Sequence, residues 1–224
     1  MLRKIFLSVL WLTFVGYAFI YVNSVIQSQE SDWDLIVKLS LGEFTGINPL
    51  LVAIFLIMGI FPTTYAAFIL FDADGQKIPP SPFVIFSFAF GAFALLPYLV
   101  LRKSNTTWQG NKNWVLKILD SSLLAIFASI AVLVLFIWGV TQGNWSDFVT
   151  QWRSSMFINV MSLDFCILSL LFPAVAGDDL KRRGVESGIL KFIPYIPLLG
   201  GFIYWCFRPK LPETESSTQA VANS

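Results

Sequence analysis

The chain has 224 residues, of which 56% are apolar and 13% are charged, against about a quarter charged in typical soluble domains. Its formal net charge of +1 gives no reason to expect a polyanionic partner, so nucleic-acid binding is not expected. The sequence has no histidine, which removes the commonest general base, the usual haem ligand and most catalytic zinc sites. We therefore expect an integral membrane protein that is not an enzyme and holds no metal or other cofactor.

Long apolar runs recur along the whole chain and predict an all-α membrane protein, a bundle of about six transmembrane helices with short interfacial helices. Residues 1–207 would form a single polytopic membrane domain, followed by a disordered polar tail over residues 208–224. The six expected spans cover residues 5–26, 48–71, 83–101, 117–140, 155–175 and 188–207.

Two segments between the spans have the pattern of helices that lie on the membrane surface. In the first, Ser31 and Asp32 resemble a helix N-cap and its acidic first turn, and apolar residues follow on one side of the helix. In the second, Trp145, Phe148 and Trp152 recur at three- and four-residue spacing in a polar background. Both segments are expected to lie at the membrane interface.

The link that starts at Asp72 begins like a calcium-binding loop, but Lys77 takes the sixth position, where glycine is needed, and Phe83 takes the twelfth, where glutamate is needed. We interpret this link as a turn. In the last span, Pro194 and Pro197 interrupt the apolar run, which predicts a helix that is kinked or locally unwound.

The basic residues suggest an orientation in the membrane. Six spans place the Lys181–Arg183 loop on a side with nine lysines and arginines, and the N-terminus on a side with six. The positive-inside rule then favours a cytoplasmic Lys181–Arg183 loop and an external N-terminus. Arg3 and Lys4 argue against the external N-terminus, and a first segment that does not cross the membrane would reconcile the two signals.

Asp164 lies near the centre of the span over residues 155–175. A carboxylate at that depth costs about 2.5–3.5 kcal/mol even on insertion scales, so it must be protonated, paired, or directed toward protein or water. We therefore expect this helix inside the bundle. Asp164 is either a buried structural carboxyl or a tentative ligand-binding residue, and the sequence leaves both interpretations open.

Small residues at helical spacing predict close helix packing in three of the spans. Ser155 to Ser169 form a small and polar stripe on a different side of the helix from Asp164, and this stripe includes Cys166. A second row joins Ser87, Gly91 and Ala94, and a third joins Ser121, Ala125 and Ser129. Cys166 and Cys206 are interpreted as small packing residues, not as a redox or metal pair.

Several motifs in about the last ninety residues resemble a bacterial three-helix membrane domain, the domain of unknown function 2834. They are Asn144-Trp145-Ser146-Asp147-Phe148, Ser162-Leu163-Asp164, the charged turn 178–184, and Ile196-Pro197-Leu198-Leu199-Gly200 with Arg208-Pro209. Longer proteins of this general appearance occur in cyanobacteria and plastids, so the resemblance implies a bacterial plasma membrane or a thylakoid membrane. It implies no activity, and it places the arginine-rich turn in the cytoplasm.

Two functions follow from these patterns. The favoured one is a non-enzymatic membrane protein that acts through helix packing, in assembling or stabilising a membrane complex, with the bilayer and either a membrane-protein partner or a second copy as its partners. The alternative is a carrier or binding protein for a small or lipophilic ligand, with Asp164 and the interrupted last span lining the site. The surroundings of Asp164 distinguish the two, because polar groups beside a cavity would favour binding.

Overall fold

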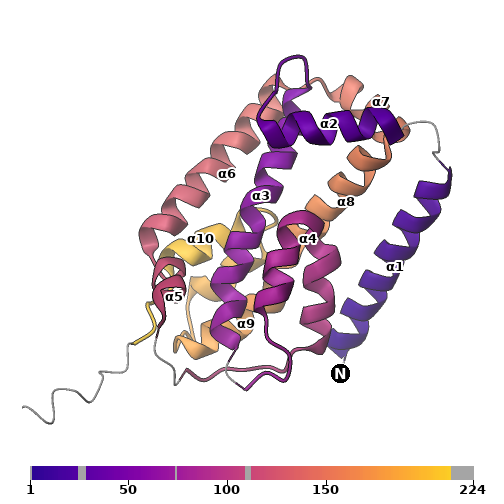
Figure 1. Cartoon of the computed structure of the whole chain (residues 1–224). Coiled ribbons are helices and arrows are strands. Elements are labelled where there is room, and N and C mark those ends of the chain that lie inside the picture. Colours follow the sequence, from indigo (N-terminus) through magenta and orange to yellow (C-terminus); the bar gives the residue numbers. More distant parts are fainter. Residues whose placement is uncertain (1, 25–28, 74, 109–111, 213–224) are drawn as a thin grey trace, which may run out of the picture.

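The computed structural model describes residues 2–24, 29–73, 75–108 and 112–212, and every regular element in these ranges is a helix (Figure 1). Five of the described helices are long and apolar enough to cross a membrane, which supports an all-α integral membrane protein but not the expected count of six. The elements are α1 (Leu2–Ser24), α2 (Gln29–Leu41), α3 (Pro49–Ile69), η2 (Leu70–Asp72), α4 (Ser81–Leu101), α5 (Trp114–Leu119), α6 (Ser122–Gln142), α7 (Trp145–Ser154), α8 (Met156–Leu170), α9 (Pro173–Arg182), η3 (Ile189–Lys191), η4 (Ile193–Tyr195) and α10 (Gly200–Phe207).

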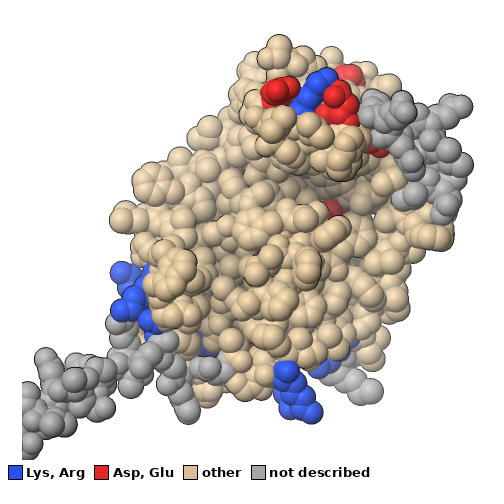
Figure 2. Space-filling model, in the orientation of Figure 1, with Lys and Arg blue, Asp and Glu red and all other residues tan. Residues whose placement is uncertain are grey.

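The long helices run between two ends of the molecule (Figure 1). Helices α2 and α7 lie across one end, which we call the α2–α7 end, and α5 and α9 mark the opposite, α5–α9 end. No residue of α7 is buried, as expected for a surface helix. Figure 2 shows charged side chains gathered at both ends of this face, with a broad, almost uncharged band between them. That band is what a bilayer requires of a membrane protein.

Helix α4 is not a straight span but a helical hairpin. Gly91 has non-helical dihedral angles (φ 47°, ψ −125°) and separates residues 81–90 from residues 92–101. The rings of Phe83 and Tyr98 lie 5.4 Å apart, whereas fifteen residues of continuous helix would separate them by about 22 Å. Arg102, at the end of the hairpin, pairs with Asp72 at 2.6 Å, so α4 returns to the end from which it started (Figure 1). The expected span over residues 83–101 therefore does not cross the molecule.

The expected last span over residues 188–207 is not a continuous helix either. It consists of two 3₁₀ turns, η3 and η4, followed by the eight-residue helix α10. The residues that flank this segment pair with the same carboxylate: Arg183 Nε lies 2.9 Å and Arg208 Nη1 lies 3.1 Å from Asp179. The segment therefore leaves the α5–α9 end and returns to it, and the prolines that predicted an unwound helix lie in or next to η4.

Pro173 explains where the predicted fifth span breaks. A proline has no N–H, so it leaves the carbonyl four residues earlier without its helical partner. That carbonyl, of Ser169, accepts a hydrogen bond of 3.1 Å from the backbone N–H of Leu198 at the far point of the returning segment. The neighbouring carbonyl of Leu168 accepts one of 2.5 Å from the hydroxyl of Tyr65 in α3. At the break between α8 and α9, hydrogen bonds thus connect the end of α8 with α3 and with the returning segment.

Two predicted boundaries differ in the structure. The charged turn 178–184 was expected as a loop, but most of it belongs to α9, where Asp178, Asp179 and Arg182 are buried. The polar tail was expected to be disordered from residue 208, yet Arg208 and Leu211 are buried. The remainder of the tail, residues 213–224, lies outside the described residues.

Candidate functional site

Asp164 lies inside the bundle, on α8, and is 5% exposed. Its Oδ1 accepts a hydrogen bond of 2.8 Å from the backbone N–H of Ala92, the first residue after the turn of the α4 hairpin. The partner is thus neither a cation nor a side chain, but the backbone of a broken helix. The expectation of a central, buried helix is met by this arrangement.

The geometry of the hairpin explains why a carboxylate lies there. The first N–H groups of a helix have no partner within it, and its N-terminal end carries a partial positive charge. The half-helix over residues 92–101 begins within the bundle, where water is scarce, so its N-terminus needs an acceptor from the protein. Asp164 provides one, in the manner of a helix N-cap.

Gly91 allows the carboxylate to come this close. Its φ of +47° is one that residues with a side chain rarely adopt, and a Cβ there would overlap the carboxylate of Asp164. Helix α1 supports the same turn from the other side, since Trp11 Nε1 donates a 3.1 Å hydrogen bond to the carbonyl of Phe93 and Phe14 stacks on the Phe93 ring at 4.1 Å. The tip is therefore held by α8 and by α1.

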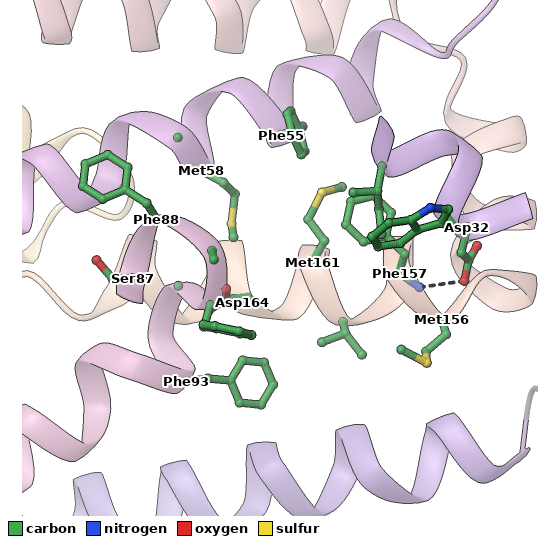
Figure 3. Close-up of a pocket in the computed structure, with 17 residues that line it drawn as sticks. Asp32, Phe55, Met58, Ser87, Phe88, Phe93, Met156, Phe157, Met161 and Asp164 are labelled. Atoms are coloured by element: carbon green, nitrogen blue, oxygen red, sulfur yellow. Dashed lines mark hydrogen bonds between the residues drawn. The ribbon is translucent and has the colours of Figure 1, made fainter. Parts of the chain in front are cut away.

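A cavity of about 430 Å³ lies beside this tip, between α2, α3, α4 and α8 (Figure 3). Asp164, Ser87 and Phe93 line one part of it, and Asp32 of α2 lines the part nearest the α2–α7 end. A volume of 300–1,000 Å³ with a mainly apolar lining and few polar groups is typical of small-molecule sites. The cavity is in that range and lies in the half of the molecule that faces the α2–α7 end.

The lining is apolar, deformable and without a cation. The three methionines other than Met1 all line it, and methionine adapts its shape to irregular ligands. Aromatic rings cover several walls, namely those of Trp33, Phe55, Phe88, Phe90, Phe93 and Phe157. Among the described residues, no lysine or arginine lines the cavity, whereas two carboxylates do, those of Asp32 and Asp164.

The two carboxylates have different freedom to bind a ligand. Asp32 was expected to begin its own surface helix, but α2 already begins at Gln29, and both Asp32 oxygens face the start of α8. Asp32 Oδ1 accepts from the hydroxyl of Ser155 at 2.6 Å, and Oδ2 accepts from the N–H of Phe157 at 3.1 Å. Asp164 Oδ1 accepts from Ala92, and its Oδ2 lies against Gly91, so among the described residues the Asp164 carboxylate has one recorded hydrogen bond whereas that of Asp32 has two.

The sequence predicted that Asp164 lies beside an interrupted helix, but the interrupted helix is not the predicted one. The interrupted segment 188–207 contributes no residue to this cavity; the interruption that does is at Gly91. The available signal was the Ser87, Gly91 and Ala94 row, which we interpreted as a packing face. Ser87 does line the cavity and Gly91 makes the turn, so the row marks a reversal of the chain.

A second polar cluster, which sequence reasoning did not assemble, closes the α5–α9 end. Asp72 pairs with Arg102 and with Arg182, each at 2.6 Å, and Asp179 lies 2.9 Å from Arg183. We call it the buried ion layer; its members, none with a side chain more than 10% exposed, are Asp72, Arg102, Lys112, Asp120, Asp178, Asp179, Arg182, Arg183 and Arg208. Burial lowers the pKa of the Arg208 guanidinium, and the facing carboxylate of Asp179 opposes that shift.

These residues are far apart in the sequence and lie at or near the ends of η2, α4, α5, α9 and α10. Buried ion pairs contribute little net stability, because removing both charges from water costs about as much as their attraction returns. Breaking one such pair is costly, since a buried charge is then left alone. The layer thus fixes which helix ends meet.

Among the described residues, no group of three or more histidine, cysteine, aspartate or glutamate side chains is placed to hold a metal ion. Comparisons with known protein families, with curated proteins and with solved structures gave no match.

Proposed function

We propose that this integral membrane protein binds a small lipophilic molecule in the cavity beside the α4 hairpin. The observation that carries the proposal is the position of Asp164, whose carboxylate both caps the broken helix and borders an apolar cavity of about 430 Å³. Interrupted membrane helices with a polar group at the break are a common way to build ligand sites at membrane depth. The ligand would have an apolar body and one hydrogen-bond-donating group, a hydroxyl or an amine, directed at Asp164.

The choice of variants for a test follows from the lining. Gly59 of α3 borders the cavity, and a Cβ there meets nothing within 4 Å, so Gly59→Leu would fill the cavity without disturbing the backbone. Gly16 of α1 is outside the cavity and equally open, which makes Gly16→Leu the matched control. Asp164→Asn keeps an oxygen that can accept from Ala92 but removes the charge.

Photoreactive C16 amine and C16 alcohol probes, crosslinked to the purified protein and mapped by mass spectrometry, would test the proposal. We expect label on peptides that contain Met58, Phe157 and Met161 in the native protein and in Gly16→Leu, and loss of that label in Gly59→Leu. Asp164→Asn should weaken labelling by the amine more than labelling by the alcohol. Labelling of these peptides that is unchanged in Gly59→Leu would refute the site.

We place the α5–α9 end, with the Lys181–Arg183 segment, in the cytoplasm of a bacterial cell or on the corresponding face of a thylakoid membrane. Of the 15 lysines and arginines, only Lys38 and Arg153 belong to the helices of the α2–α7 end. The positive-inside rule supports this orientation. The cavity would then face the external half of the bilayer, from which a lipophilic ligand could enter. The resemblance to domain of unknown function 2834 stays a prediction.

Assembly of a membrane complex through helix packing is the other function that the sequence favoured. The small residues that motivated it have neighbours within the chain: Ser155 binds Asp32, and Ser129 lies 3.1 Å from the sulfur of Cys206. Parts of these rows are therefore occupied within the chain, while Cys166 of the first stripe is exposed. We keep assembly as the alternative, together with the expectation that the chain is not an enzyme. Gentle solubilisation followed by size analysis would detect a stable partner or a second copy.

A further inference from the structure

A second cavity, of about 590 Å³, lies at the α5–α9 end and is unrelated to the Asp164 site. It is formed by one side of α9, by Thr106 from the link before α5, and by the segment that carries η3 and η4. Lys181 and Lys191 contribute side chains from two of these elements, and Glu186 is the one acid among the lining residues. Unlike the Asp164 cavity, this one is lined by basic side chains.

The two lysines are available to a ligand. Both are exposed, and among the described residues neither has a carboxylate within 4 Å. The buried ion layer next to them also carries excess positive charge, with the five basic side chains of Arg102, Lys112, Arg182, Arg183 and Arg208 against four aspartates. Within that layer, Arg182 Nε and Arg183 Nη2 are buried and have no hydrogen-bond partner in the part of the chain that the structure describes. The electrostatic field at this cavity therefore favours an anion.

Large apolar side chains flank the basic cavity. Ile189, Phe192 and Tyr195 are spaced by three residues along η3 and η4, and they are 76%, 71% and 69% exposed. Residues at this spacing share one face of a 3₁₀ helix. Exposing these apolar side chains to water is energetically unfavourable. At the boundary between lipid headgroups and acyl chains they can contact lipid instead. The cavity thus opens where apolar side chains and lysines meet, which is the chemistry of a phospholipid.

We propose that this cavity binds the headgroup of an anionic phospholipid, with Lys181 and Lys191 paired with its phosphate. The exposed row of Ile189, Phe192 and Tyr195 contacts the acyl chains, which selects a lipid over a free phosphate ion. Basic pockets on the cytoplasmic side of membrane proteins recognise anionic headgroups in this way. This site is independent of the ligand proposed for the Asp164 cavity.

The test uses the full chain in a mild detergent, with lipid binding followed by native mass spectrometry. The probes are dioleoyl phosphatidylglycerol, dioleoyl phosphatidylcholine and inorganic phosphate. The test variant carries Lys181→Gln and Lys191→Gln. The control carries Lys77→Gln and Lys210→Gln, which removes the same charge from exposed lysines outside the cavity.

We expect the native protein and the control to bind phosphatidylglycerol about tenfold more tightly than phosphatidylcholine, and the test variant to lose this preference. An unchanged preference in the test variant, or an equal loss in the control, would overturn the proposal. Displacement of phosphatidylglycerol by equimolar inorganic phosphate would also overturn it, because the site would then recognise free phosphate and not a lipid.

Discussion

At the scale of single residues, the structure depends on a contact between Asp164 and a glycine. Gly91 reverses the chain, and the space that a side chain would need there is filled by the Asp164 carboxylate. The carboxylate in turn completes the N-terminus of the second half-helix through Ala92. An acid at membrane depth therefore has a structural role here, as the cap of the second half-helix.

Gly91→Ala should destabilise the protein by about 1–3 kcal/mol, because alanine is strained at φ +47° and its Cβ would displace the Asp164 carboxylate. Thermal unfolding of the purified protein in detergent measures the effect as a lower midpoint. Gly16→Ala, in an open position within α1, is the control and should leave the midpoint unchanged or raise it slightly. Equal unfolding midpoints for the two variants would refute the positive φ and the close Asp164 contact at Gly91.

At the scale of elements, the buried ion layer determines how the helix ends are arranged. Arg102 brings the end of the α4 hairpin to Asp72 at the end of η2, and Asp179 of α9 pairs with both Arg183 and Arg208. As a result, α4 and the segment over residues 188–207, each long enough to be a span, begin and end at the α5–α9 end of the molecule. Apolar packing alone would not specify this, since the apolar faces of a hairpin and of a straight helix can be equally buried.

Asp179→Asn should therefore lower the free energy of unfolding by about 3–5 kcal/mol, because Arg183 and Arg208 would lose a buried carboxylate that pairs with both of them. The exposed pair of Lys38 and Asp34, 2.6 Å apart, provides the control. Asp34→Asn should cause no measurable change, since solvent screens an exposed pair. Chemical unfolding of both variants in the same detergent measures the difference, and similar losses of stability would argue against a structural ion layer.

At the scale of the whole molecule, among the described residues, α1, α3, α6 and the pair α8 and α9 run from one end of the molecule to the other, whereas α4 and the segment over residues 188–207 return (Figure 1). Both described ends of the chain therefore lie at one end of the molecule. Arg3 lies 3.9 Å from Asp178, and Arg208 contacts Asp179. The six-span expectation that the N-terminus and the Lys181–Arg183 segment lie on opposite sides is wrong, because both lie at the same end of the molecule. The positive charge of Arg3 and Lys4 then no longer opposes the positive-inside count, because Arg3 and Lys4 lie at the same end as Lys181–Arg183. This follows from the return of α4 and of the segment over residues 188–207, while α1 keeps the length of a span.

This topology is testable with single cysteines introduced into a Cys166→Ala, Cys206→Ala background. Lys77 and Lys103 flank the α4 hairpin and are exposed, and Lys38 is exposed at the α2–α7 end. A membrane-impermeant thiol reagent should label Lys77→Cys and Lys103→Cys together in inside-out vesicles, and Lys38→Cys in right-side-out vesicles or intact cells. If α4 crossed the membrane, the first two would be labelled from opposite sides.

The membrane class of the protein, the short helices α2 and α7 and the burial of Asp164 could be predicted from the sequence alone. These follow from composition, from periodicity and from the cost of a charge in lipid, all of which are local or additive properties of the chain. Asp164 could be found in this way because one carboxylate in an apolar run needs an explanation wherever the helix lies.

Which segments run from end to end and what Asp164 faces depend on contacts between distant parts of the chain. A returning hairpin and a spanning helix have the same apolar length, so hydropathy cannot separate them. The information lies in Arg102, Asp72 and Asp179, whose partners are distant in the sequence and meet only when the helix ends are brought together. For the same reason the partner of Asp164, a backbone N–H exposed by the turn at Gly91, could not be seen in the sequence.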